Sequence, residues 1–304
     1  MIWLLLLLLV VGVLGAWFLA DATQTELSAV RKAANPRLVT LPAGVTRADW
    51  HGDVDGPVLV CIHGLSTASH VWGPLVPLLV DQGYRVLTYD LFGRGLSDRV
   101  PGPQTREFFL RQFRQLLEAE GVEGPVTLVG YSMGGQIAAA RAVEAPDHVA
   151  RLILLAPAGL GFTPGRIVQL ATEIPVLGDW VQAVVCPVVQ QWNLMRATGT
   201  SPEVDAVLAE TAKDLRVDGT MAGLLSSQRN LLSEGMIEDH RSVARSGVPL
   251  VVLWGEVDAV IPACAMGRLA QINRTAIQHQ VAGAGHALPY THAAEVAREI
   301  GETL

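Results

Sequence analysis

A single serine, Ser132, stands between glycines in the stretch VTLVGYSMGG at residues 126–135. The apolar, β-branched residues before it are typical of a buried strand, and the small residues after it predict a closely packed helix. Gly130 and Gly134 leave room for a sharp turn between the two, where a Cβ atom would clash. In this setting the pattern G-x-S-x-G predicts a nucleophile elbow, which displays the serine hydroxyl above the carboxyl ends of the strands. The alternative is a glycine-lined turn around an idle serine.

A serine hydroxyl is a weak nucleophile and needs a base that is itself oriented by a carboxylate. Asp258 follows an apolar strand in VVLWGEVDAVIP, and His286 lies in a glycine-flanked loop in QVAGAGHALPY. The chain order serine, acid, histidine is one of the known orders of a catalytic triad. Glu256 is a second candidate for the acid, and His292 lies near the preferred histidine but on the expected last helix.

Ester or amide hydrolysis by a serine also needs two backbone donors for the oxyanion. The first expected donor is the N–H of Met133, directly after the nucleophile, at the positive end of the helix that follows. The second is the N–H of Leu65, in the loop CIHGLSTASHVW after an earlier strand. His63 precedes Ser132 in the chain, and we interpret it as a residue that organises this loop rather than as the base.

Short apolar strands alternate with helical patterns along much of the chain. The expected strands are 57–64, 85–90, 125–130, 150–157 and 249–255, and the helical patterns between them are 71–82, 105–120 and 133–144. Such alternation predicts an α/β fold with a doubly wound, mostly parallel sheet. LVTLPAG and TRADWHG before it predict a short antiparallel pair. Residues 159–245 carry no strong strand pattern, so we expect a helical cap inserted into the sheet domain.

The N-terminal stretch MIWLLLLLLVVGVLGAWFLA has no charge over residues 2–20. As a helix it would be roughly 28 Å long, close to the thickness of the hydrocarbon core of a bilayer. Trp3 and Trp17 lie near its ends, where interfacial aromatic residues belong. This predicts a single-pass membrane anchor. The pattern does not decide on which side of the membrane the catalytic domain lies. A cleaved signal peptide, which would make the protein periplasmic or secreted, is the alternative, because Ala-Asp-Ala at 20–22 has the form of a cleavage site.

Five segments together resemble those of the α/β-hydrolase family of serine hydrolases, and in its order. They are IHGLSTASHVW, TYDLFGRGLSD, VGYSMGG, WGEVDAVIP and GAGHALPY, and the resemblance extends from about residue 38 to the end. It implies an eight-stranded, mostly parallel sheet and a covalent acyl-enzyme. It also implies a triad and an oxyanion hole formed by Ser132, Asp258 and His286 with Leu65 and Met133.

The expected organisation has five parts. These are an N-terminal anchor or signal at 1–22, a linker at 23–36, a first core part at 37–158, the cap at 159–245 and a second core part at 246–304. The cap is rich in large apolar residues, among them Trp180, Trp192 and Met195, which either line an acyl pocket or only pack the cap on the sheet.

Composition excludes several classes of partner. The chain of 304 residues is 50% hydrophobic and has a net charge of −7. Nucleic acid is not expected as a partner, because phosphate binding needs clustered lysine and arginine. The three cysteines are widely spaced, which indicates neither a disulfide framework nor a zinc site. We therefore expect no metal and no cofactor.

These features predict a serine hydrolase acting on a small-molecule ester, with lipid esters among the expected substrates. The expected activity is that of a carboxylesterase or a monoacylglycerol lipase on apolar acyl groups. One alternative keeps the triad but acts as a carbon–carbon bond hydrolase or a cofactor-free perhydrolase. The other is a membrane-anchored scaffold without catalytic activity.

Overall fold

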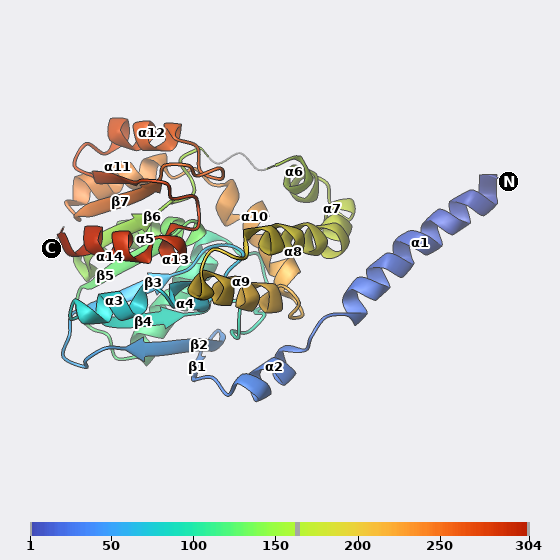
Figure 1. The fold of residues 1–304 in the computed structure, drawn as a ribbon, viewed down its shortest axis with the longest axis horizontal. Helices are drawn as coiled ribbons and strands as arrows, with labels where there is room; N and C mark the ends of the chain where they lie inside the picture. Colours follow the sequence, from blue (N-terminus) through green and yellow to red (C-terminus); the bar gives the residue numbers. More distant parts are fainter. Residues whose placement is uncertain (1, 162–164, 303–304) are drawn as a thin grey trace.

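An eight-stranded sheet runs through the centre of the protein (Figure 1). The computed structural model describes residues 2–161 and 165–302, and within 2–10 the backbone alone. The strands are β1 Leu38–Leu41, β2 Gly44–His51, β3 Val58–Ile62, β4 Arg85–Tyr89, β5 Val126–Tyr131, β6 Val149–Leu155, β7 Leu250–Gly255 and β8 Ile277–Val281. They lie in the order β1-β2-β4-β3-β5-β6-β7-β8. Only the β1–β2 and β2–β4 pairs are antiparallel, so the predicted mostly parallel, eight-stranded sheet is confirmed.

Helices cover both faces of this sheet. They are α3 Val76–Asp81, α4 Arg106–Ala119, α5 Met133–Glu144, α11 Ile237–Ser246, α12 Cys264–Ile272, α13 Leu288–Thr291 and α14 Ala293–Glu302. From β3 the chain first adds β4 on one side of β3. It then crosses back to add β5, β6, β7 and β8 on the other side. Right-handed crossovers therefore place α3 on one face and α4 and α5 on the other. In agreement with this, α14 contacts α3, whereas α5 contacts α4 and α11.

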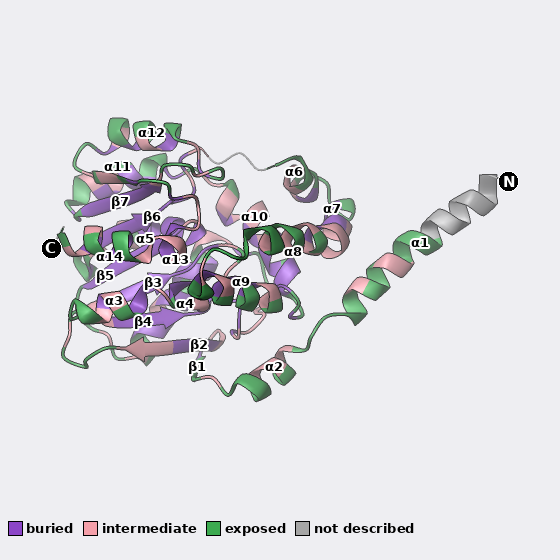
Figure 2. Ribbon diagram, in the orientation of Figure 1, coloured by how far each residue is buried: buried purple, intermediate pink, exposed green. Residues whose placement is uncertain are grey.

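The central strands are buried because of this double cover (Figure 2). Every residue of β5 is buried, as are four of the five residues of β3. A strand with both faces covered has no solvent side, and this explains why both read as continuous apolar runs rather than as alternating patterns. The helices that follow β3 and β5 lie on opposite faces. The carboxyl ends of these two neighbouring strands thus form the crevice where α/β sheets bind ligands.

The predicted strand-free region between β6 and β7 is helical. It contains α6 Arg166–Glu173, α7 Leu177–Trp180, a π-helical turn Val181–Val185, α8 Cys186–Ala197, α9 Pro202–Asp214, α10 Thr220–Arg229 and a 3₁₀ turn Leu231–Ser233. We call α6 to α10 the cap. It has a small apolar core of its own, formed by Ala171, Val181, Cys186, Leu215, Met221, Leu224 and Leu225. The helix α11 falls within the interval expected for the cap, but it packs against α5 and α12 on the sheet.

Two helices precede the sheet, α1 at Ile2–Ala22 and α2 at Leu27–Ala34. The helix α1 projects away from the sheet (Figure 1). It contacts the cap, where the indole N–H of Trp180 donates to the Val13 carbonyl over 3.0 Å. Within the described residues, no helix has the length and apolar character needed to cross a membrane. The predicted transmembrane anchor is therefore not supported, and the side chains of its first half lie outside the described residues. The cellular location stays a prediction.

Candidate active site

The chain makes a strained turn at Ser132, between the end of β5 and the start of α5. This residue has φ 52° and ψ −116°, in the region that non-glycine residues rarely adopt. Its carbonyl accepts the N–H groups of Gly135 and Ala158, at 2.9 and 3.1 Å, and its own N–H donates to Leu155. A Cβ atom at Gly134 would collide with the backbone carbonyl of Ile62, at the end of the neighbouring strand β3. The turn thus exists because surrounding backbone holds it and because glycine gives it space.

The structure brings Ser132, His286 and Asp258 together, although they are far apart in the chain. The Nε2 atom of His286 lies 3.0 Å from the Ser132 hydroxyl oxygen, and its Nδ1 atom lies 2.9 Å from a carboxylate oxygen of Asp258. The other oxygen of that carboxylate accepts the backbone N–H groups of Val260 and Ile261, at 2.7 and 2.9 Å. A proton on Nδ1 donates to the carboxylate, which leaves Nε2 free to accept the serine proton.

The electrostatics of Asp258 suit an ionised partner for the imidazole. Burial by itself would raise the pKa of this carboxyl group. The hydrogen bond from His286 and the two backbone N–H groups outweigh burial and hold the pKa below its usual value. The carboxylate is therefore charged at neutral pH and stabilises the imidazolium that forms when His286 takes a proton.

The two alternative residues lie elsewhere. The carboxylate of Glu256 accepts the backbone N–H of Gly283 over 2.8 Å and so ties a turn instead of facing the imidazole. The Nδ1 atom of His292 lies 3.0 Å from the Thr291 hydroxyl, beside the start of α14. The choice of Asp258 over Glu256 thus agrees with the geometry.

The expected oxyanion donors lie on either side of the serine. Met133 is the first residue of α5, so its N–H has no partner within the helix. Leu65 follows Gly64, which packs directly against the side chains of Tyr131 and Ser132. In the part of the chain that the structure describes, neither N–H donates to another residue. Both are thus available to a substrate oxygen.

Two buried side chains fix the loop that carries Leu65. The Nδ1–H of His63 donates to the Gly64 carbonyl over 2.9 Å, and the Leu91 N–H donates to its Nε2 atom, also over 2.9 Å. Burial lowers the pKa of His63 to about 4, so the ring is neutral and keeps both bonds at neutral pH. This arrangement matches its expected role in organising the loop. The Nε–H of Arg94 donates to the Leu65 carbonyl over 3.0 Å.

Arg94 also joins this loop to the cap. The residue is only 1% exposed, and its guanidinium donates to the Ser227 hydroxyl of α10 over 2.7 Å. The remaining acceptors are the Phe92 carbonyl and the Gln104 side-chain oxygen, so every hydrogen-bond acceptor that the structure gives this guanidinium is neutral. Burial and the nearby Arg99 lower the pKa of Arg94 to about 9. This contact could not be predicted from the sequence, because a lone arginine between two glycines has many possible partners.

A cavity of about 190 Å³ opens at the Ser132 hydroxyl, and we call it the Ser132 cavity. Its walls are mostly apolar, with the ring of Tyr131 lying 5.3 Å from that of His286, centre to centre. The lining residues are Gly64, Leu65, Ser66, Thr67, Tyr131, Ser132, Ala158, Leu232, Val260, Ile261 and His286.

The three apolar cap residues expected at the substrate site are not among them. Trp192 is 55% exposed and stacks under Arg196, and Met195 is 64% exposed. Trp180 points toward α1, to which its indole is bonded. The structure therefore does not place these three residues at the Ser132 cavity, and their binding of substrate stays a prediction. Apolar residues are abundant on α7 and α8, but the faces that carry these three turn outward or toward α1. The apolar wall residues Leu232 and Val260 were missed.

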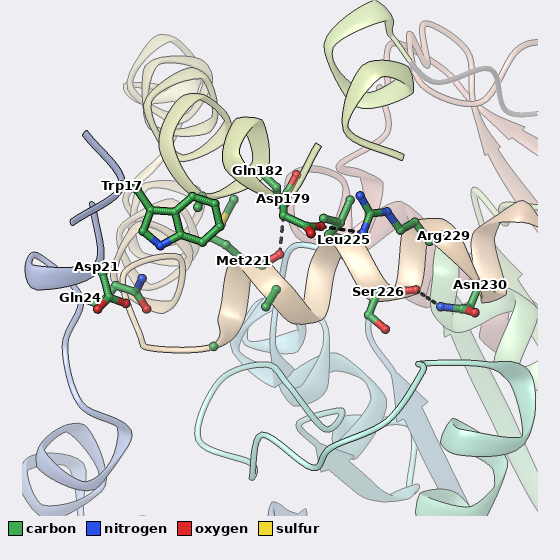
Figure 3. Close-up of a pocket in the computed structure, with 13 residues that line it drawn as sticks. Trp17, Asp21, Gln24, Asp179, Gln182, Met221, Leu225, Ser226, Arg229 and Asn230 are labelled. Atoms are coloured by element: carbon green, nitrogen blue, oxygen red, sulfur yellow. Dashed lines mark hydrogen bonds and ion pairs between the residues drawn. The ribbon is translucent and has the colours of Figure 1, made fainter. Parts of the chain in front are cut away.

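A second cavity, of about 610 Å³, lies between the C-terminal end of α1 and the cap (Figure 3). We call it the α1–α10 cavity. Trp17 of α1 and Met221 and Leu225 of α10 supply apolar surface. Most polar groups around it are already bonded to one another, as in the pair of Arg229 and Asp179 at 2.6 Å (Figure 3). Its described lining contains no histidine beside a serine, so it lacks the base that a nucleophile needs.

A strained serine that is hydrogen-bonded to a histidine–carboxylate pair, at the carboxyl ends of a doubly wound sheet, defines the protein as a hydrolase. The particular family follows from sequence comparison, since residues 59–299 match the family model described as the alpha/beta hydrolase family. The chain belongs to this family, as its motifs had indicated.

Named relatives within the family act on different substrates. A 2-hydroxy-6-oxononadienedioate/2-hydroxy-6-oxononatrienedioate hydrolase of Paraburkholderia xenovorans is 27% identical over 293 residues, which cover 92% of this chain and 99% of the relative. A mouse sn-1-specific diacylglycerol lipase is 35% identical over 148 residues, 46% of this chain and 47% of that protein. The crystal structure of an enol-lactonase from Burkholderia xenovorans has a TM-score of 0.71 at 22% identity and covers 88% of this chain and 98% of the enzyme, which shows a shared fold.

Proposed function

We propose that this protein is a serine hydrolase that cleaves carboxylic esters through an acyl-enzyme on Ser132. The observation that carries the proposal is the hydrogen-bonded series from the Ser132 hydroxyl through His286 to Asp258. It lies beside two unengaged backbone N–H groups, those of Leu65 and Met133. Together they supply a nucleophile, its base, the carboxylate that orients the base and the donors for an oxyanion.

The reaction would proceed in two halves. His286 takes the proton of the Ser132 hydroxyl as its oxygen attacks the ester carbonyl, and the developing oxyanion is held by the N–H groups of Leu65 and Met133. The intermediate collapses, the imidazolium gives its proton to the departing alcohol, and the acyl group remains on the serine. A water molecule, deprotonated by the same imidazole, then releases the acid and restores the hydroxyl.

A second candidate is favoured by one comparison. The relative that matches nearly the whole chain is named as a hydrolase of a hydroxy-oxo-dienedioate. Hydrolysis of a carbon–carbon bond next to a ketone, by the same three residues, is therefore the alternative reaction. The two candidates share the nucleophile and differ in the substrate, so a substrate panel separates them.

Replacing the nucleophile tests the proposal directly. With p-nitrophenyl acetate and butyrate, we expect the S132A variant to lose on the order of 10⁶ in kcat, because the triad acts as a unit. The matched control is S28A, which removes an exposed serine hydroxyl on α2, away from the residues around the Ser132 cavity, and should keep the activity within about threefold.

Three outcomes distinguish the candidates. Ester hydrolysis that is lost in S132A and kept in S28A supports the proposal. Wild-type protein that cleaves 2-hydroxy-6-oxononadienedioate but no ester, again only with Ser132 present, selects the second candidate. Hydrolysis that persists unchanged in S132A contradicts both.

A further inference from the structure

The Ser132 cavity is small for a ligand site. Its volume of about 190 Å³ lies below the range of about 300–1,000 Å³ that is usual for pockets holding drug-sized molecules. The carbonyl group under attack already occupies part of that space, so a short acyl group fits the remainder better than a long one.

One wall of this cavity has a different origin from the others. Apart from Leu232, its lining residues end a strand or lie in the loops that follow the strands of the sheet. Leu232 comes from the 3₁₀ turn after α10, where the cap returns to the sheet. Its side chain is partly buried and packs against the main apolar core. The cap thus reaches the Ser132 cavity through this leucine.

The turn that carries Leu232 is fastened to the nucleophile helix. Gln136, fully buried on α5, donates from its side-chain nitrogen to the carbonyls of Leu231 and Glu234, at 3.4 and 3.1 Å. The N–H of Leu231 donates to the Gln104 carbonyl over 3.4 Å. Because Gln136 lies one turn along the helix from Ser132, these bonds fix the leucine relative to the reacting hydroxyl. The wall is therefore preformed, and its position sets the size of the cavity.

The charge of the lining limits the substrate further. Among the described residues around the Ser132 cavity there is no lysine or arginine, and His286 is the only titratable base. A carboxylate on the acyl group would be buried here without a positively charged partner, which is unfavourable. The apolar surfaces of Leu65, Leu232 and Ile261 suit an uncharged alkyl chain instead.

We infer that the substrates are short-chain, uncharged carboxylic esters and that Leu232 is the specificity-determining residue that limits the length of the acyl chain. This inference rests on the proposed ester hydrolysis at Ser132. It narrows the predicted class of apolar acyl groups to its short members and assigns the limit to a residue outside the predicted site.

The test compares p-nitrophenyl acetate, butyrate, hexanoate and octanoate with the full-length wild-type protein and the variants L232A and L232W. Wild-type kcat/KM should be highest for acetate or butyrate and at least about tenfold lower for octanoate, since a long chain clashes with a fixed wall. Truncation in L232A should raise the ratio of octanoate to butyrate activity by about tenfold or more. L232W should restrict hydrolysis to the acetate.

The control is W192A, which truncates an exposed cap residue outside the Ser132 cavity and should leave the chain-length profile unchanged. Each variant's ratio is internal to it, so partial loss of folded protein does not distort the result. Labelling of Ser132 by diethyl p-nitrophenyl phosphate reports the folded fraction. A wild-type optimum at octanoate, or an unchanged ratio in L232A, overturns the inference while leaving ester hydrolysis in place. No ester hydrolysis by wild type, or equal hydrolysis by S132A, contradicts the proposed function itself.

Discussion

The Ser132 cavity and the α1–α10 cavity differ in what builds their walls. The first is lined by strand ends, by the loops that follow strands and by one turn that returns from the cap. The second is lined by helix faces of α1, α10 and the π-helical turn. It is also about three times larger, at about 610 Å³ against about 190 Å³. Size alone would select the cavity that lacks Ser132 and His286.

The difference shows in how the polar groups are used. Around the α1–α10 cavity, the side chains of Arg229, Asn230 and Gln182 each donate to a neighbouring protein oxygen. At the Ser132 cavity, backbone N–H groups hold the Asp258 carboxylate in place. The N–H groups of Leu65 and Met133 donate to no other described residue and remain available to a substrate oxygen. A catalytic site needs donors that are fixed but unsatisfied until the substrate arrives. Only the smaller cavity meets this requirement.

Loss of the Asp258 charge should produce the largest change after loss of the nucleophile. In D258N, the amide can no longer hold the proton on Nδ1 of His286, so the ring tends toward the wrong tautomer. We expect kcat for p-nitrophenyl acetate to fall by about 10⁴, measured by steady-state kinetics.

The matched variant is E256Q, which neutralises the neighbouring carboxylate that bonds to the Gly283 N–H. Its kcat should stay within about tenfold of the wild type. If E256Q loses more activity than D258N, Glu256 is the acid of the triad, and the hydrogen bond between His286 and Asp258 is not the one used in catalysis.

A smaller effect is expected from Arg94, because it acts on the site through the position of Leu65. In R94M, the Leu65 carbonyl and the Ser227 hydroxyl lose their donor. Loss of a direct oxyanion donor costs about 10²–10³ in kcat, so this indirect change should lower kcat about 10- to 100-fold. KM should change by less than about threefold, since the cavity walls remain.

Lysine at this position restores a buried donor without the fork of the guanidinium. R94K should therefore recover part of the kcat lost in R94M. A raised KM with unchanged kcat in both variants would mean that Arg94 supports the cavity wall and not the oxyanion loop. Thermal melting of each variant separates either result from a loss of folded protein.

How far the sequence could predict this site depended on the kind of signal each residue gives. Ser132 and its glycines carry a pattern that only a strained turn requires, and Asp258 and His286 lie directly after strands in the expected order. Their convergence follows from the parallel sheet, since its strands end at one edge. The double cover of the sheet could likewise be read from continuous apolar runs.

The cap offered no comparable signal. Apolar residues on the cap helices can either pack the cap or line a pocket. Composition alone therefore could not tell which face of the helices carries Trp180, Trp192 and Met195. Leu232 belongs to a 3₁₀ turn that is too short to show a period. The buried bonds of Arg94 and Gln136 join segments more than ninety residues apart, and spacing along the chain carries no trace of them.

The smallest effect is expected when the larger cavity is filled. Ala222 is an exposed residue of α10 on the wall of the α1–α10 cavity, so A222W adds an indole there without crowding the core. We expect kcat/KM for p-nitrophenyl acetate and butyrate to stay within about twofold of the wild type. At the Ser132 cavity, L232W adds less volume than A222W but should abolish butyrate hydrolysis, because that cavity is small and its wall is fixed. A large loss in A222W would mean that substrate passes through the α1–α10 cavity, and the two regions would then form one site rather than two.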